Sequence, residues 1–294
     1  MNKFYIQIVF FLLSVSVYLN NKTLATEPAS EENTKTKEKT KTKPGKTYST
    51  PEEIYKQNKQ LLCTNRNETI NAEKFMNEAV VHLAYHATNE DGYKLCELSQ
   101  HYNRTFSRKK HGDTDIQRIN CKHYNPYKYN AIINLLWDPA LASDFNPDSV
   151  NRKIVRVYNP NLVMIQQRYK SGFRGRDKYF YALATKAQIS EEKTIIVMAS
   201  ANINDGHPSK EKFKNEIIEN ANLFKTQINS EYDIKNGKLK KIFVNIAGYL
   251  IEHRDWYIDI TYLESIDGHT PNYNKLFIDV ALNEIFRSNE KYVM

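Results

Sequence analysis

Residues 152–169 read RKIVRVYNPNLVMIQQRY, and this stretch decides the fold. Both of its arms are rich in β-branched, aromatic and other apolar residues, a composition typical of β-strands. Asn159, Pro160 and Asn161 separate the two arms, and these residue types favour a turn. The stretch therefore predicts a β-hairpin with strands at 152–158 and 162–169.

Two more hairpins follow the same pattern downstream. Their strands are expected at 179–189 with 194–201, and at 242–251 with 256–266. The segment between these two hairpins, residues 202–241, is polar and holds one amphipathic stretch at 213–224. We interpret it as an insertion or a long lid.

The first part of the domain mixes helices with shorter strands. Phe75, Ala79 and Leu83 recur at helical spacing and predict a helix over 71–87. A short helix capped by Ser49 or Thr50 is expected to precede it. The remaining predicted elements are strands at 93–99, 104–109 and 116–123, a helix at 127–137, a short helix or loop at 140–148, and a long amphipathic helix after Gly268.

This order of elements resembles the START lipid-transfer domain, and specific motifs strengthen the likeness. They are YNAIINLLWDP at 129–139, Arg176-Asp177 before a strand, AGYLI at 247–251 and IDITY at 258–262. The resemblance implies an α+β, START-like helix-grip fold over 51–294. In such a fold a curved antiparallel sheet wraps around a long C-terminal helix and encloses a tunnel.

A closer likeness covers essentially the whole chain. The leader MNKFYIQ, PEEIY at 51–55, VRVYNPNLV at 155–163 and FYALATK at 180–186 resemble the fam-a proteins of malaria parasites. That resemblance implies a secreted lipid-binding and lipid-transfer protein, located in the parasitophorous vacuole or exported into the host erythrocyte.

The N-terminal residues carry their own signals. Lys3, an apolar run and the small residues Thr23 and Ala25 predict a secretory signal peptide over 1–25, with a retained anchor as the alternative. Residues 26–50 are rich in Lys and Thr and predict a disordered basic linker, although a polybasic lipid or nucleic-acid contact is the alternative. An oxidising compartment would permit one disulfide among the three cysteines, whose pairing stays open.

The START resemblance suggests which side chains line a lipid pocket. The faces of a strand alternate with period two, so Val163 and Ile165 share one face, as do Phe180, Ala182 and Ala184. Met164, Leu141, Phe145 and the last helix around Phe277 would form a gate. The predicted pocket-lining residues are Trp137, Leu141, Phe145, Val163, Ile165, Phe180, Ala182, Ala184, Met198, Phe243, Tyr249 and Phe277. A fully packed core without a cavity is the alternative.

Four polar residues within otherwise apolar strands are headgroup candidates: Arg156, Gln167, Arg168 and Asn245. An inward arginine could pair with a phosphate, whereas an outward one would be solvated. The chain has no basic residue at 140–142, where phosphatidylcholine-binding relatives carry one. The ligand is therefore expected to be a phospholipid or another lipid.

Other classes of function find little support. The chain lacks GxSxG, HExxH and GxxxxGK[ST] motifs, so we expect no enzyme. His82 and His86 have i, i+4 spacing but no evident third ligand, and we expect neither metal nor cofactor. Lysine is dispersed, which disfavours nucleic-acid binding. The expected protein is a monomer that touches membranes transiently, and the alternative is an exported interaction protein that uses a START scaffold without transfer activity.

Overall fold

The computed structural model describes residues 49–99, 104–138, 150–171, 175–209 and 213–267. The chain divides into two units, 1–48 and 49–294, and all described residues belong to the second. The predicted signal peptide, linker and C-terminal helix lie outside the described residues, as do Leu141, Phe145 and Phe277. No described helix is both long enough and apolar enough to cross a membrane.

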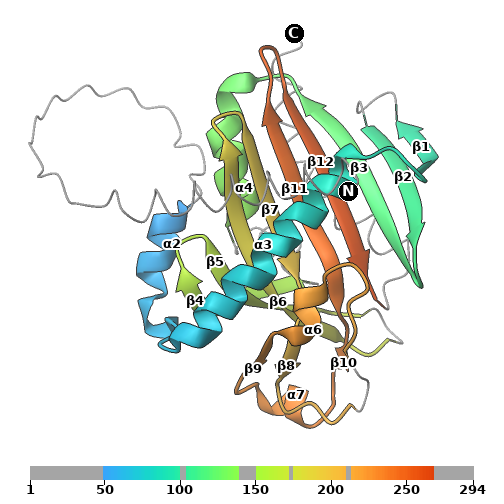
Figure 1. The fold of residues 1–294 in the computed structure, drawn as a ribbon. Helices are drawn as coiled ribbons and strands as arrows, with labels where there is room; N and C mark the ends of the chain where they lie inside the picture. The colour runs from blue at the N-terminus through green and yellow to red at the C-terminus, as the bar shows by residue number, and fades with distance from the viewer. Residues whose placement is uncertain (1–48, 100–103, 139–149, 172–174, 210–212, 268–294) are drawn as a thin grey trace, which may run out of the picture. The chain divides into compact units, whose positions relative to one another are not determined.

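One large sheet dominates the fold (Figure 1). Its main path runs β1-β2-β3-β12-β11-β7-β6-β5-β4, and every neighbouring pair on this path is antiparallel. All three predicted long hairpins are confirmed. The strands are β1 Lys94–Ser99, β2 Arg104–His111, β3 Thr114–His123, β4 Val150–Asn159, β5 Leu162–Tyr169, β6 Lys178–Ser190, β7 Lys193–Ala199, β11 Val244–His253 and β12 Ile258–Ile266.

Two of the described helices, α2 and α3, begin at side-chain caps. Thr50 and Glu53 form a capping box at the start of α2 (Pro51–Gln57). The side chain of Asn65 accepts a hydrogen bond from the backbone of Glu68 and so caps α3 (Arg66–Thr88), which is longer at both ends than the predicted 71–87. The other helices described before residue 202 are η1 Lys59–Leu61, η3 Pro126–Lys128 and α4 Tyr129–Trp137.

Helix α3 lies obliquely across β7, β11 and β12 (Figure 1). We call the side of the sheet that it covers the outer face and the opposite side the inner face. Gly248 of β11 makes the close approach possible. A Cβ at this position would lie 2.1 Å from the carbonyl oxygen of Ile196 and 2.9 Å from Cδ1 of Leu83 on α3. Any larger residue would push both the helix and the neighbouring strand away.

The segment 202–241 also packs on the outer face, where it joins α3 and the strands. It contains β8 Asn202–Asn204, α6 Glu219–Leu223, β9 Lys225–Gln227, α7 Tyr232–Lys235 and β10 Lys240–Lys241. Glu78 of α3 accepts hydrogen bonds from the backbone N–H groups of Glu219 and Asn220, each at 2.9 Å, and so holds the start of α6. The expectation of an insertion is confirmed, but its position on the outer face means that it is not a lid over the inner face. Only part of the predicted amphipathic stretch 213–224 is helical.

Candidate functional site

Strand register fixes which side chains share the inner face. Residues directly opposite each other in antiparallel strands point to the same side. Val163, Ile165 and Gln167 of β5 face Ala184, Ala182 and Phe180 of β6. The same row continues across the sheet, from Ala184 to Met198, from Met198 to Ala247, from Ile196 to Tyr249, and from Tyr249 to Tyr262.

Seven of the predicted pocket-lining residues therefore lie on one face: Val163, Ile165, Phe180, Ala182, Ala184, Met198 and Tyr249. Trp137 ends α4, which lies on the same side because Tyr129 at its start donates a hydrogen bond to Thr194, 3.0 Å away. The indole nitrogen of Trp137 is buried, and within the described part of the chain it has no hydrogen-bond partner. Whether these residues bind a lipid stays a prediction.

The remaining described candidates lie elsewhere. Phe243 and Asn245 line a separate pocket at the end of the sheet, with a volume of about 240 Å³. Its other lining residues are Asp113, Thr114, Lys214, Glu216 and Asp267. Met164, expected at the gate, points to the outer face and is completely buried there.

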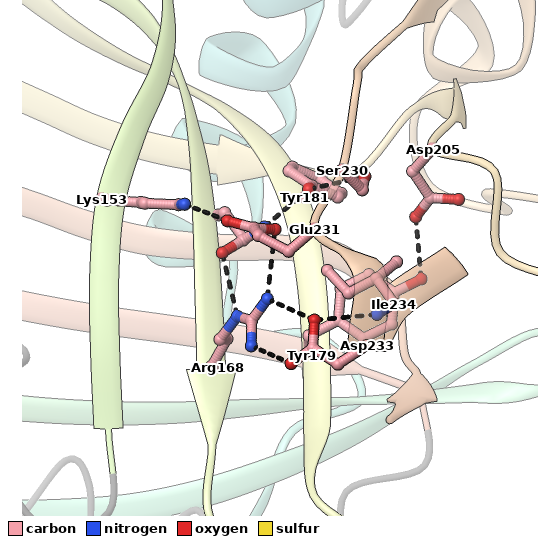
Figure 2. Close-up of polar contacts among 10 residues, drawn as sticks. Lys153, Arg168, Tyr179, Tyr181, Asp205, Ser230, Glu231, Asp233 and Ile234 are labelled. Atoms are coloured by element: carbon pink, nitrogen blue, oxygen red, sulfur yellow. Dashed lines mark hydrogen bonds and ion pairs between the residues drawn. The ribbon is translucent and has the colours of Figure 1, made fainter. Parts of the chain in front are cut away.

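Arg168 lies on the outer face, in a polar network between the sheet and the segment 202–241 (Figure 2). Its guanidinium donates to both carboxylate oxygens of Asp233, at 2.6 and 3.1 Å, and lies 3.1 Å from Glu231. Next to it, Gln166 donates to the hydroxyl of Tyr181 at 2.6 Å and to Glu231 at 2.8 Å. Arg168 therefore holds the insertion in place and does not reach the inner face.

Arg156 occupies a similar position on the outer side. It donates to Glu68 of α3 at 2.6 Å and to the carbonyl of Gln227 at 2.9 Å. Glu68 also accepts a hydrogen bond from Tyr158. Of the four headgroup candidates, the structure brings only Gln167 to the inner face.

A polar centre that the sequence reasoning missed surrounds Gln167. The amide oxygen of Gln167 accepts a hydrogen bond from Nε of Arg152 at 2.6 Å, and its Nε2 donates to the hydroxyl of Tyr169 at 2.5 Å. On β12, further along the same inner face, the hydroxyl of Tyr262 donates a hydrogen bond to Glu264 at 2.7 Å. We call Arg152, Gln167, Tyr169, Tyr249, Tyr262 and Glu264 the inner polar centre.

The inner polar centre is formed because the sheet curves. Arg152 lies on β4 and Tyr262 on β12, with four strands between them in the sheet order, yet the two side chains interact electrostatically. Burial lowers the pKa of the Arg152 guanidinium, and burial together with the Glu264 charge raises the pKa of the Tyr262 hydroxyl. A guanidinium and a carboxylate thus lie in a poorly hydrated space among aromatic rings.

Several side chains on the inner face are partly exposed. Arg152, Ala184, Met198 and Tyr249 are only half-buried although they point toward the inside of the curved sheet. Other inner-face side chains, such as Phe180, Ile251 and Ile260, are fully buried. The described part of the inner face therefore retains accessible surface.

Two further expectations concern metal and cysteine chemistry. Within the described ranges, no group of three or more His, Cys, Asp or Glu side chains could hold a metal ion. Cys63, Cys96 and Cys121 are all free thiols, so no disulfide joins them in this structure. Burial raises the pKa of the Cys121 thiol to about 12.

Comparison with solved structures identifies the architecture as a START-like α+β fold, as predicted. Human StAR-related lipid transfer protein 5 is similar with a TM-score of 0.53 and 12% identity, over 77% of this chain and 97% of that protein. Human STARD10 is similar with a TM-score of 0.50 and 13% identity, over 72% and 79%. At these identities the likeness shows the fold alone. No known family profile and no curated protein sequence matches the chain.

Proposed function

We propose that this protein is a non-enzymatic lipid carrier that holds one lipid molecule against the inner face of its sheet. The observation that carries the proposal is the inner polar centre, which places Arg152 and Glu264 among apolar and aromatic residues on the inner side of the curved sheet. A lipid has matching chemistry, because its headgroup is polar and its tails are apolar. One structural neighbour, human StAR-related lipid transfer protein 5, is named for lipid transfer, which supports the same proposal.

The energetics favour such a ligand. Each CH₂ group that leaves water contributes about 0.8 kcal/mol, so even one acyl chain would supply a large share of the binding free energy. The polar centre would orient the ligand, since a buried guanidinium gains most from a charged or strongly polar partner. The buried indole N–H of Trp137 is a further donor that a ligand could satisfy.

Native mass spectrometry of the purified protein, followed by lipid extraction, tests the proposal. We expect one bound lipid per chain, and we expect the protein to move a fluorescent phospholipid between vesicles. Ala184→Trp fills part of the inner face and should abolish both properties. The matched control is Ala131→Trp on the exposed side of α4, which should retain them.

An empty wild-type protein that moves no lipid would contradict the carrier proposal. It would favour the interaction protein that uses the same scaffold without transfer activity. A lipid retained equally by Ala184→Trp and Ala131→Trp would instead show that the ligand binds away from the inner face.

The finer proposal places the protein outside the cell that makes it, in a parasitophorous vacuole or a host erythrocyte. It rests on the signal-peptide pattern at 1–25 and on the resemblance to fam-a proteins. A fluorescent reporter fused after residue 50 and expressed in a malaria parasite tests it. We expect secretion of the reporter, and deletion of residues 1–25 should retain it in the cytoplasm.

A further inference from the structure

Three histidines meet between the C-terminal part of α3 and the last residue of β2. The ring centroids of His82 and His86, one turn apart on α3, are 6.4 Å apart and stacked. His111 of β2 meets His86 edge-on at 5.5 Å. His86 is only 1% exposed, whereas His82 and His111 are half-buried. The contact between helix and strand therefore depends on imidazole packing.

His86 is held in its neutral form. Burial lowers the pKa of its imidazole to about 3, and the nearby His111, His82 and Lys109 act in the same direction. Within the described residues, its Nδ1 is buried and makes no hydrogen bond. A proton at this nitrogen would have no acceptor and would add positive charge beside Lys109.

The nearby carboxylates are already engaged. On α3, Glu78 lies 3.6 Å from His82, but its oxygens also accept the backbone N–H groups at the start of α6. The carboxylate of Glu90 forms an ion pair with Arg118 of β3, with 2.5 Å between the guanidinium nitrogen and the carboxylate oxygen.

The insertion contributes one more acid near His111. Glu216 accepts the backbone N–H of Asp113 at 2.9 Å and pairs with Lys214 at 2.9 Å. The charge of His111 also acts on Glu216. Around His86 itself the contacting rings belong to His82, Tyr85 and His111, and none of them supplies a negative charge at neutral pH.

We propose that His82, His86 and His111 form an acid-sensitive latch between α3 and the β2–β3 hairpin. When the pH falls, a proton on His86 places a positive charge beside Lys109 within this packed contact, and the end of α3 separates from β2. The described residues include no metal-binding group, so protons rather than a metal ion are the effector. The latch is a property of the outer face and does not depend on whether the inner face holds a lipid.

The sign of the effect follows from the direction of the shift. The ordinary pKa of a histidine side chain is 6.5, and burial lowers the pKa of His86 in the folded protein to about 3. The stabilisation by neutral His86 is complete above pH 6.5 and is lost progressively as the pH falls toward 3. Each pH unit within that window changes the opening equilibrium up to tenfold.

Hydrogen exchange of the full chain tests the latch. The exchange rates are measured in the presence of EDTA and are normalised to the intrinsic rate at each pH. From pH 7.5 to pH 5.5 we expect local opening of peptides covering 80–88 and 107–118 to increase about tenfold, while β5 and β6 change little. His86→Leu removes the titrating group and should abolish the pH dependence, whatever it does to overall stability. His253→Gln, at the far end of β11, is the matched control and should behave as the wild type.

His111→Leu provides a second test at a half-buried position if His86→Leu does not fold. It should at least halve the response of the 80–88 peptides to acid. The proposal is wrong if wild-type exchange in these peptides is independent of pH, or if the leucine variants open with acid as the wild type does. Unchanged exchange would leave the lipid-carrier proposal intact, because that proposal is tested separately, by the lipid bound to the protein at pH 7.5.

Discussion

The two faces of the sheet are built from the same strands but have different surroundings. On the outer face, α3 and the segment 202–241 cover the strands, and charged side chains such as Arg156 and Arg168 are matched with carboxylates. On the inner face, Ala184, Met198 and Tyr249 stay half-buried, and Tyr249 interacts with the Arg152 guanidinium. The difference suggests that stability is concentrated on one side of the sheet and ligand binding on the other.

Adjacent residues of β11 give the strongest test of this division. Gly248→Val should destabilise the protein by about 3 kcal/mol or more, because its side chain would overlap the backbone of Ile196 and the side chain of Leu83. The next residue faces inward, and Tyr249→Phe should change stability by less than about 1 kcal/mol. Chemical denaturation measures both. Equal losses in the two variants would contradict the division.

Removal of a buried side chain from α3 should have the next largest effect. Leu83 is fully buried against the outer face, and Leu83→Ala should cost about 3 kcal/mol of unfolding free energy. Leu223→Ala on α6 is the matched control, since Leu223 is 66% exposed and its loss should cost no more than about 0.5 kcal/mol. Thermal or urea unfolding gives both values. A cost below about 1 kcal/mol for Leu83→Ala would mean that α3 contributes little to the outer face.

Glu78 links α3 to the insertion and gives a pH-dependent test. Burial alone would raise the pKa of its carboxyl, but hydrogen bonds from His82 and from the backbone at Asn220 and Glu219 outweigh burial and lower the pKa to about 2. This stabilisation is present above pH 4.5 and is lost as the pH falls from 4.5 toward 2. Glu78→Gln should therefore cost about 2 kcal/mol at pH 7 and almost nothing near pH 2.

Denaturation curves at several pH values measure that difference. Glu73→Gln on the same helix is the control, because Glu73 is exposed and accepts a hydrogen bond only from Asn159 among the described side chains. A cost of Glu78→Gln that is the same at pH 7 and pH 3 would show that the carboxylate charge is not what holds α6.

The sequence predicted the strands well but only part of the site. The local composition of residues 152–169 predicts a hairpin. The alternation of side chains between the two faces of a strand correctly groups Val163 with Ile165, and Phe180 with Ala182. Local pattern cannot say which group faces inward. Arg168 resembles a headgroup-binding residue because it interrupts an apolar strand, yet its partners Glu231 and Asp233, far along the chain, lie on the outer face.

The inner polar centre was missed for a related reason. Arg152 begins a strand, a position where a solvated arginine is ordinary, and nothing local distinguishes it. Its significance comes from the curvature that brings β4 near β12, a long-range property of the sheet. Gln167 offered the one available signal, because Arg152 lies opposite it in the hairpin register and Tyr169 lies two residues further on the same face.

Only a small change in stability is expected at Met198 on the inner face. Because Met198 is half-buried, Met198→Ala should cost about 1 kcal/mol or less, well below the cost of Leu83→Ala. If the inner face holds a lipid, the enlarged space should shift the bound population toward longer or bulkier tails, which lipid extraction and mass spectrometry would detect. A loss of about 3 kcal/mol with no change in bound lipid would show instead that Met198 belongs to a packed core, and the two faces would then differ less than the half-buried side chains suggest.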